Sequence, residues 1–127
     1  MTPKEELTPS ETLIMKCIWD SGQEMALGEI LAQVNETYGK HWKSQTVSTF
    51  LGKLVYKGFV RMKRKGRRIT YEILVDEKTY SAQQADQFVA FWNEGSVGQF
   101  LTAFYHDKKA TKEELEELRK IIDELDN

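Results

Sequence analysis

Residues 44–75 read SQTVSTFLGKLVYKGFVRMKRKGRRITYEILV, and the spacing of the apolar side chains changes within this stretch. Before Gly58 the apolar residues recur every three or four positions, which predicts a helix beginning near Ser44. After Gly58 apolar and basic residues alternate, as in a β-strand, and residues 68–75 are rich in β-branched and aromatic side chains. With a turn at Lys65-Gly66-Arg67, the pattern predicts a β-hairpin with a basic tip.

Two further helices are predicted on the N-terminal side of this stretch. Thr8-Pro9-Ser10-Glu11 has the pattern of a capping box with proline at the first helical position, and this helix is expected to run to about Trp19. A second helix is expected from about Ala26 to Tyr38, where Gly39 ends it. Three short helices followed by a hairpin predict a winged helix-turn-helix. The expected fold class is mainly α with a small β-hairpin.

The net charge of −2 conceals a strong segregation of charge along the chain. Residues 1–36 carry a net charge of −5, residues 37–75 carry +9 and residues 76–127 carry −6. No carboxylate interrupts the basic run from Lys57 to Arg68, and such crowding of like charge is destabilising unless an anion neutralises it. Only the middle block can attract a polyanion, so we expect it to contact the phosphates of double-stranded DNA.

The helix after Ser44 carries uncharged polar side chains opposite its apolar face, and such side chains can read base edges in the major groove. Gln45 is the best candidate for paired hydrogen bonds to an adenine, while the basic hairpin tip is expected to contact the DNA backbone. Two alternatives stay open: Thr46 only caps its helix, and Gly52 serves a tight helix crossing rather than an approach to DNA. The predicted DNA-binding residues are Lys43, Ser44, Gln45, Thr46, Ser48, Thr49, Lys53, Lys63, Arg64, Lys65, Arg67 and Arg68.

The C-terminal part of the chain has more apolar surface than its predicted helices can bury. Nine large apolar residues lie between Phe88 and Tyr105, in a helical stretch that Gly95 and Gly98 are expected to kink, and a second capping box at Thr111 opens a last helix. We predict a DNA-binding domain at 1–76 and a helical dimerisation region at 77–127. The alternative is that these helices fold back and complete a monomeric core. The predicted dimerisation residues are Phe88, Phe91, Trp92, Val97, Phe100, Leu101, Phe104, Leu115, Leu118 and Ile122.

Several stretches, spread in order along nearly the whole chain, carry a resemblance to one family. They are Leu7-Thr8-Pro9-Ser10-Glu11, Gly28-Glu29-Ile30-Leu31, residues 46–54 (TVSTFLGKL), Lys57-Gly58-Phe59-Val60 and residues 95–101 (GSVGQFL). In these stretches the sequence resembles the BlaI/MecI/CopY family of penicillinase and copper-homeostasis repressors. The resemblance implies a homodimeric repressor whose winged helices bind a palindromic operator and are released by an inducing signal.

The sequence departs from that family at two places that bear on the signal. Copper-responsive members carry a Cys-x-Cys motif near the C-terminus, and this chain has none there. Penicillinase repressors of the family are cleaved at an Asn-Phe bond in the dimerisation helix, and the aligned pair here is Ala103-Phe104. The resemblance therefore implies an inducer-linked protease as a further partner, with Ala103 and Phe104 as the candidate cleavage site.

Other classes of function find little support in the sequence. His41 and His106 lie far apart and Cys17 falls on the apolar side of its helix, so no catalytic site, metal site or cofactor is expected, and the chain is not expected to be an enzyme. An N-terminus without a signal-peptide pattern and the lack of a long apolar run lead us to expect a cytoplasmic protein with no membrane partner. The main alternative function is a protein-interaction adaptor that uses the acidic, aromatic C-terminal helices.

Overall fold

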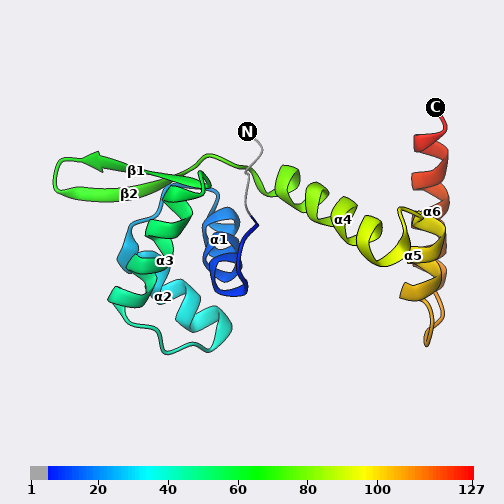
Figure 1. Cartoon of the computed structure of the whole chain (residues 1–127), viewed down its shortest axis with the longest axis horizontal. Coiled ribbons are helices and arrows are strands. Elements are labelled where there is room, and N and C mark those ends of the chain that lie inside the picture. Colours follow the sequence, from blue (N-terminus) through cyan, green and yellow to red (C-terminus); the bar gives the residue numbers. More distant parts are fainter. Residues whose placement is uncertain (1–5) are drawn as a thin grey trace. The chain divides into compact units, whose positions relative to one another are not determined.

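The computed structural model describes residues 6–127, and the chain divides into two compact units. The first unit extends to Ala82 and the second comprises Gln83–Asn127. In the first, three helices are followed by a two-stranded antiparallel hairpin that lies beside them (Figure 1), which confirms the predicted winged helix. Its elements are α1 (Pro9–Ser21), α2 (Leu27–Tyr38), α3 (Ser44–Tyr56), β1 (Val60–Lys65) and β2 (Arg68–Ile73).

Local sequence signals set the ends of these helices. The Thr8 hydroxyl accepts a hydrogen bond from the Glu11 amide, and the Glu11 carboxylate accepts one from the Thr8 amide, which confirms the predicted capping box. At the other end Gly22 adopts a left-handed conformation with φ of 68°, so α1 continues two residues beyond the predicted end at Trp19. The helices bury one apolar core: Ile14, Met15, Cys17, Ile18, Ile30, Val34, Val47, Leu51 and Leu54. Burial raises the pKa of the Cys17 thiol, in agreement with its predicted role as a core residue.

The hairpin is attached to the helices through backbone and aromatic contacts. Its register pairs Val60 with Ile73 and Lys65 with Arg68, so residues 66 and 67 form the turn. The amide of Tyr71 donates a hydrogen bond of 2.9 Å to the carbonyl of Met25, which ties the outer edge of β2 to the segment before α2. The Met25–Tyr71 bridge adds a third backbone segment beside the two strands and stabilises a hairpin that would be marginal alone.

The first turns of α4 (Glu77–Asn93) belong to the winged-helix unit. Tyr80 is buried, its ring packs edge-on against Phe59 at 5.2 Å between centroids, and its hydroxyl accepts a hydrogen bond from the Leu7 amide. The Trp19 ring is 6.1 Å from that of Tyr80 and donates from its indole nitrogen to the Val75 carbonyl. The compact unit therefore extends past residue 76, because Tyr80 completes its core.

The second unit contains the remainder of α4 together with α5 (Val97–Phe104) and α6 (Lys112–Leu125). The helical stretch expected around Gly95 and Gly98 is two separate helices, because Glu94 and Gly95 both have positive φ, at 53° and 78°. Gly98 lies inside α5 and makes no break. The Thr111–Glu114 capping box at the start of α6 is confirmed. No helix within residues 6–127 has both the length and the hydropathy needed to span a membrane.

Candidate nucleic-acid interface

Helix α3 has one buried face and one face open to solvent. Val47, Leu51 and Leu54 are fully buried and fix the rotation of the helix. The start of α3 is held by the Asn35 side chain, which bonds both the amide and the carbonyl of Trp42 at 3.0 Å. The exposed face presents the side chains of Gln45, Ser48, Thr49 and Lys53 together, as their spacing predicted, with Lys43 and Ser44 exposed at the N-terminal end.

The hydroxyl groups on α3 have different roles. The Thr49 hydroxyl donates to the Gln45 carbonyl at 2.9 Å, so its remaining acceptor capacity and its methyl group are what it can offer to DNA. Thr46 is half-buried and does not cap the helix, because the N-cap position is occupied by Lys43, which makes no side-chain capping bond. The capping alternative for Thr46 is therefore wrong.

Gly52 lies on the exposed side of α3 with no structural neighbour. A Cβ atom placed there would meet no other atom within 4 Å. The alternative that Gly52 permits a tight crossing with another helix is therefore wrong for the described chain. The bare backbone at this position is open to an approaching ligand.

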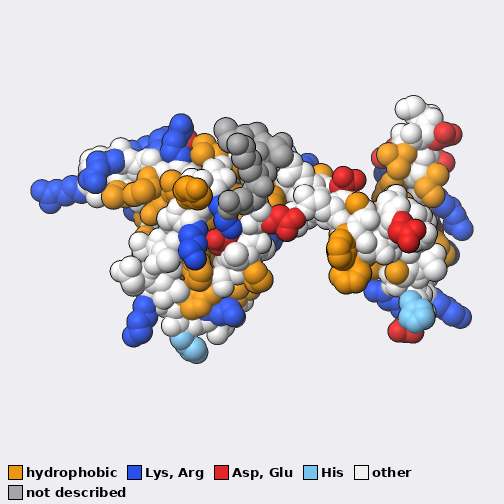
Figure 2. All heavy atoms as spheres, viewed as in Figure 1, with side chains coloured by type: hydrophobic (Ala, Val, Ile, Leu, Met, Phe, Trp, Pro, Cys, Tyr) orange, Lys and Arg blue, Asp and Glu red, His pale blue; other side chains and the backbone are white. Residues whose placement is uncertain are grey.

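The basic side chains of the hairpin gather along β1, β2 and their turn (Figure 2). Most of them have carboxylate partners. Glu24 lies 3.5 Å from Lys63 and 3.4 Å from Lys65, and Glu29 lies 2.6 Å from Arg68. Within the hairpin, Glu72 pairs with Arg61 and Lys63. In residues 6–127 no carboxylate lies within salt-bridge distance of Arg64 or Arg67, which are exposed near the hairpin turn and are fully available to a phosphate.

These ion pairs change the interpretation of the uninterrupted basic run. The crowding of positive charge between Lys57 and Arg68 requires neutralisation by negative charge, and carboxylates of the protein itself supply part of it. Burial alone would raise the pKa of Glu24, but the charges of Lys63 and Lys65 lower it below its ordinary value. The hydrogen bond from Arg61 likewise lowers the pKa of Glu72. Both carboxylates therefore stay charged at neutral pH.

Sequence reasoning missed the acidic residues of this surface. Glu24 and Glu29 belong to the acidic N-terminal block and reach the hairpin only because the segment from Met25 into α2 lies against β2. Glu11 also escaped notice as an ion-pair residue: its carboxylate accepts a hydrogen bond of 2.6 Å from the Lys57 ammonium group. The capping box identified the position of Glu11, but no local signal identifies a partner 46 residues away.

The predicted dimerisation residues lie on the second unit, and most of their side chains are exposed. Phe91 is 78% exposed, Trp92 67% and Val97 64%. Phe88 packs edge-on against Phe100 at 6.0 Å, and Phe100 stacks on Phe104 at 6.2 Å, so the aromatic side chains of α4 and α5 form one cluster. Leu115 and Ile122 are exposed on α6, whereas Phe100, Leu101 and Leu118 are half-buried. Ala103 is exposed beside Phe104 near the end of α5.

Residues 7–124 match the family model described as penicillinase repressor. The chain belongs to the penicillinase repressor family. The penicillinase repressor of Bacillus licheniformis is 25% identical over 122 residues, which cover 96% of this chain and 93% of that protein. The methicillin resistance regulatory protein MecI of Staphylococcus aureus is 25% identical over 117 residues, covering 92% of this chain and 93% of MecI.

The winged-helix fold of this member of the penicillinase repressor family also matches a solved structure. The solution structure of monomeric Bacillus licheniformis BlaI in complex with the blaP half-operator is 26% identical, with a TM-score of 0.52, and the match covers 63% of this chain and 94% of that chain. Members of the family are DNA-binding transcriptional repressors and not enzymes, and the chain is one of them.

Proposed function

We propose that this penicillinase repressor-family protein works as a homodimer that represses transcription by binding an inverted-repeat operator. The first unit, which ends at Ala82, supplies one winged helix to each half-site, and residues 83–127 join the two copies. An inducing signal that acts on the dimerisation helices releases the protein from DNA. The observation that carries the proposal is the exposed face of α3 beside the basic hairpin, in a chain similar to BlaI, which was solved with a half-operator.

The exposed face of α3 has the chemistry of a major-groove reader. The side-chain amide of Gln45 can donate from Nε2 to N7 of adenine and accept at Oε1 from the adenine N6 amino group, and this pair of hydrogen bonds gives base discrimination. Ser48 and the Thr49 methyl group can contact neighbouring base edges, and Lys53 lies one turn further along the same face. Lys43, Ser44 and Thr46, at the start of the helix, are suited to phosphate contact.

The hairpin supplies sequence-independent affinity. Arg64 and Arg67 are exposed and free of carboxylate partners within the described chain, so their planar guanidinium groups can bind phosphates directly. Three other basic residues of the hairpin must exchange an existing carboxylate partner for a phosphate: Lys63, Lys65 and Arg68. Each of them therefore releases fewer counterions on binding DNA than Arg64 or Arg67 does. We therefore assign the largest share of backbone affinity in the hairpin to Arg64 and Arg67.

The second unit supports dimerisation because its apolar side chains point outward. Nine of the eleven large hydrophobic residues classed as exposed in the described chain lie in residues 83–127. Their exposed surface amounts to about 1,000 Å² per copy, judged from typical side-chain areas, and a standard protein interface needs roughly 800 Å² per partner. A second copy of the chain, with the same apolar surface, is the simplest partner that can cover it.

We also propose that Ala103-Phe104 is where a proteolytic signal would act, with an inducer-linked protease as the partner. This peptide bond lies in the last turn of α5, and helix ends open more easily than helix centres. Phe104 packs on Phe100 and Tyr105, so a cut here would remove apolar contacts that the dimer requires. Loss of the dimer would then separate the two half-site contacts.

The experiment that tests this function is selection of binding sites from a random duplex library by the full-length protein. We expect enrichment of an inverted repeat whose half-site centres lie about 10 to 10.5 base pairs apart, or a multiple of that spacing. Enrichment of a single, unrepeated site would refute the dimeric operator. Failure to retain any duplex at low salt would favour the alternative, a protein-interaction adaptor that uses the C-terminal helices.

A further inference from the structure

Asn93 is the one buried residue in the second unit, and it is polar. It ends α4 and is only 8% exposed, while no apolar side chain between residues 83 and 127 is buried. Its Oδ1 atom has no hydrogen-bond partner. A buried amide oxygen without a donor is costly, so its position calls for an explanation.

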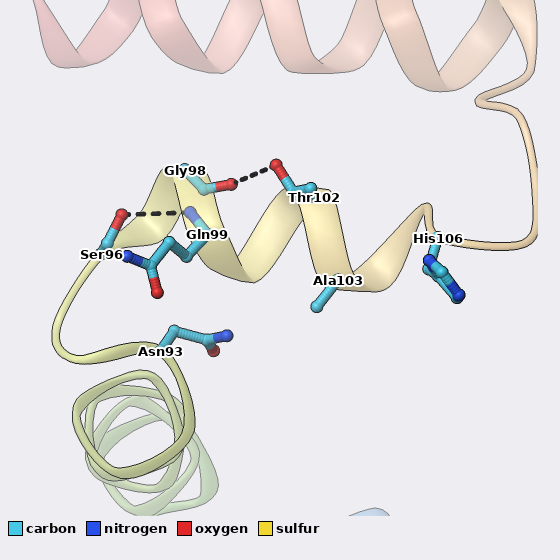
Figure 3. Close-up of a pocket in the computed structure, with 7 residues that line it drawn as sticks. All are labelled: Asn93, Ser96, Gly98, Gln99, Thr102, Ala103 and His106. Carbon is cyan, nitrogen blue, oxygen red and sulfur yellow. Dashed lines mark hydrogen bonds between the residues drawn. The ribbon is translucent and has the colours of Figure 1, made fainter.

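Two grooves meet at Asn93. A groove of about 780 Å³ is lined by Asn93, Ser96, Gln99, Thr102, Ala103 and His106, and Figure 3 shows Asn93 extending beneath α5 in the direction of Ala103. A second groove of about 360 Å³ shares Asn93 and Ala103 and is otherwise lined by aromatic side chains: Phe88, Trp92, Phe100 and Phe104. Asn93 therefore borders both grooves, of which the second is lined mainly by aromatic side chains.

Both hydroxyl groups that line the first groove form hydrogen bonds with the backbone, and only that of Thr102 uses its proton to do so. The Thr102 hydroxyl donates to the Gly98 carbonyl at 2.9 Å, and the Ser96 hydroxyl oxygen accepts from the Gln99 amide at 3.0 Å (Figure 3). Neither interaction reaches Oδ1 of Asn93. Oδ1 itself is closed to solvent, so a donor from outside the chain reaches it only when the Asn93 side chain turns toward the open groove.

We propose that this donor comes from a second copy of the chain, and that the hydrogen bond to Asn93 Oδ1 sets the register of the dimer. The inference rests on the homodimer proposed above and assigns it a polar pairing contact. A single polar residue in an otherwise apolar interface selects one alignment of the partners, because any other alignment leaves the polar group buried and unpaired.

The surroundings of Asn93 favour a protein copy as the occupant. Phe91 and Trp92, directly before it, are 78% and 67% exposed, and Val97, just after it, is 64% exposed. These three side chains are among the nine exposed apolar side chains of the second unit, whose summed exposed area of about 1,000 Å² exceeds the roughly 800 Å² per partner of a standard interface. A small polar ligand would satisfy Asn93 and leave these apolar side chains uncovered.

The test uses the wild-type protein, with copies labelled with ¹⁵N and ²H and returned to ordinary water, so that only their N–H groups carry protons, mixed with unlabelled copies and exchanged by dilution and concentration. Isotope-filtered NMR should show transfer from the Asn93 side-chain amide protons to protons of the unlabelled copy. A dimer without such transfer would overturn the inference and leave the proposed function standing. A protein that sediments as a monomer at all concentrations would instead refute the proposed homodimer.

A pair of variants measures the strength of this contact. Asn93→Ala should weaken dimerisation about tenfold in sedimentation equilibrium, because the partner's donor loses its acceptor. Gln87→Ala is the matched control, since Gln87 is an exposed amide on the same helix, and its dimerisation constant should not change. Circular dichroism establishes that both variants are folded. A folded Asn93→Ala protein that dimerises as tightly as the Gln87→Ala control would contradict the proposal.

Discussion

At the scale of single residues, the Glu11–Lys57 pair shows how one carboxylate can serve two parts of the fold. Glu11 is 1% exposed, and its Oε1 atom accepts from the Thr8 amide at 2.9 Å and from the Lys57 ammonium group at 2.6 Å. Lys57 follows α3 and also donates to the Glu6 carbonyl at 2.9 Å. One side chain thus caps α1 and joins it to the end of the DNA-reading helix.

We predict that Glu11→Gln destabilises the protein by about 3 kcal/mol, because the nearly buried ammonium group of Lys57 loses its charged partner. Thr8→Ala should cost only about 1 kcal/mol, since it removes the cap and keeps the ion pair. Urea unfolding curves of the two variants and the wild type provide the comparison. Equal losses in the two variants would show that the ion pair adds nothing beyond the cap.

The same pair predicts a pH dependence. Burial alone would raise the pKa of Glu11, but the hydrogen bonds from Lys57 and Thr8 and the charge of Lys57 together lower it below the ordinary value of 4.5. The stabilisation is therefore fully present above about pH 4.5 and is lost as the pH falls through the lower, folded-state value. The free energy of unfolding should decline less steeply with acid in Glu11→Gln than in the wild type. Parallel declines would contradict the assignment.

Gly52 provides a second test at this scale. Gly52→Ala should stabilise the free protein by up to about 1 kcal/mol, since alanine favours helix and the added Cβ meets no atom within 4 Å. If α3 lies deep in the major groove, the same change should weaken operator binding. Gly28→Ala in α2 is the control, because it also adds a Cβ in open space and should leave DNA affinity unchanged. Operator affinity undiminished in Gly52→Ala would show that the glycine is not needed for close approach.

At the scale of elements, substitutions in α3 and substitutions in the hairpin should weaken DNA binding in different ways. Gln45→Ala should lose about 1 to 3 kcal/mol of discrimination at particular base pairs and keep its salt dependence. Arg67→Ala should weaken all duplexes and reduce the slope of log affinity against log salt by about one. Arg68→Ala should reduce the slope by less, because Arg68 is already paired with Glu29 in the free protein. Fluorescence anisotropy across a salt series, with cognate and scrambled duplexes, measures both effects. A larger slope change for Arg68→Ala than for Arg67→Ala would contradict the charge assignment.

The elements also show what the sequence can and cannot predict. Capping boxes at Thr8 and Thr111 and the period change at Gly58 depend on neighbouring residues, and the structure confirms all three. Glu11, which pairs with Lys57, and Glu24, which pairs with Lys63 and Lys65, lie tens of residues away along the chain, so no local pattern indicates them. The sequence predicts only a kink near Gly95, whereas the structure has a break between two helices at Glu94–Gly95. A glycine indicates where the backbone can bend, but it does not specify the angle between the flanking helices. The importance of Asn93 follows from its burial, which sequence alone does not give.

At the scale of the whole molecule, Tyr80 determines where the chain can be divided. A fragment ending at residue 76 lacks Tyr80, which packs on Phe59 and Trp19 and bonds the Leu7 amide. We predict that a fragment ending at residue 82 unfolds at higher temperature than one ending at residue 76, as measured by circular dichroism. Loss of a buried aromatic side chain typically costs about 3 to 5 kcal/mol. Identical melting temperatures would show that Tyr80 is dispensable to the winged helix.

The central claim is that two winged helices joined by the C-terminal helices bind one operator. Its most direct test compares the affinity of the full chain for the selected inverted repeat with its affinity for a single half-site. The full chain should bind the repeat at least about a hundredfold more tightly, since the dimer link gives the second contact a high effective concentration. The fragment ending at residue 82 should gain almost nothing from the second half-site. A full chain that binds the half-site as tightly as the inverted repeat would contradict the account.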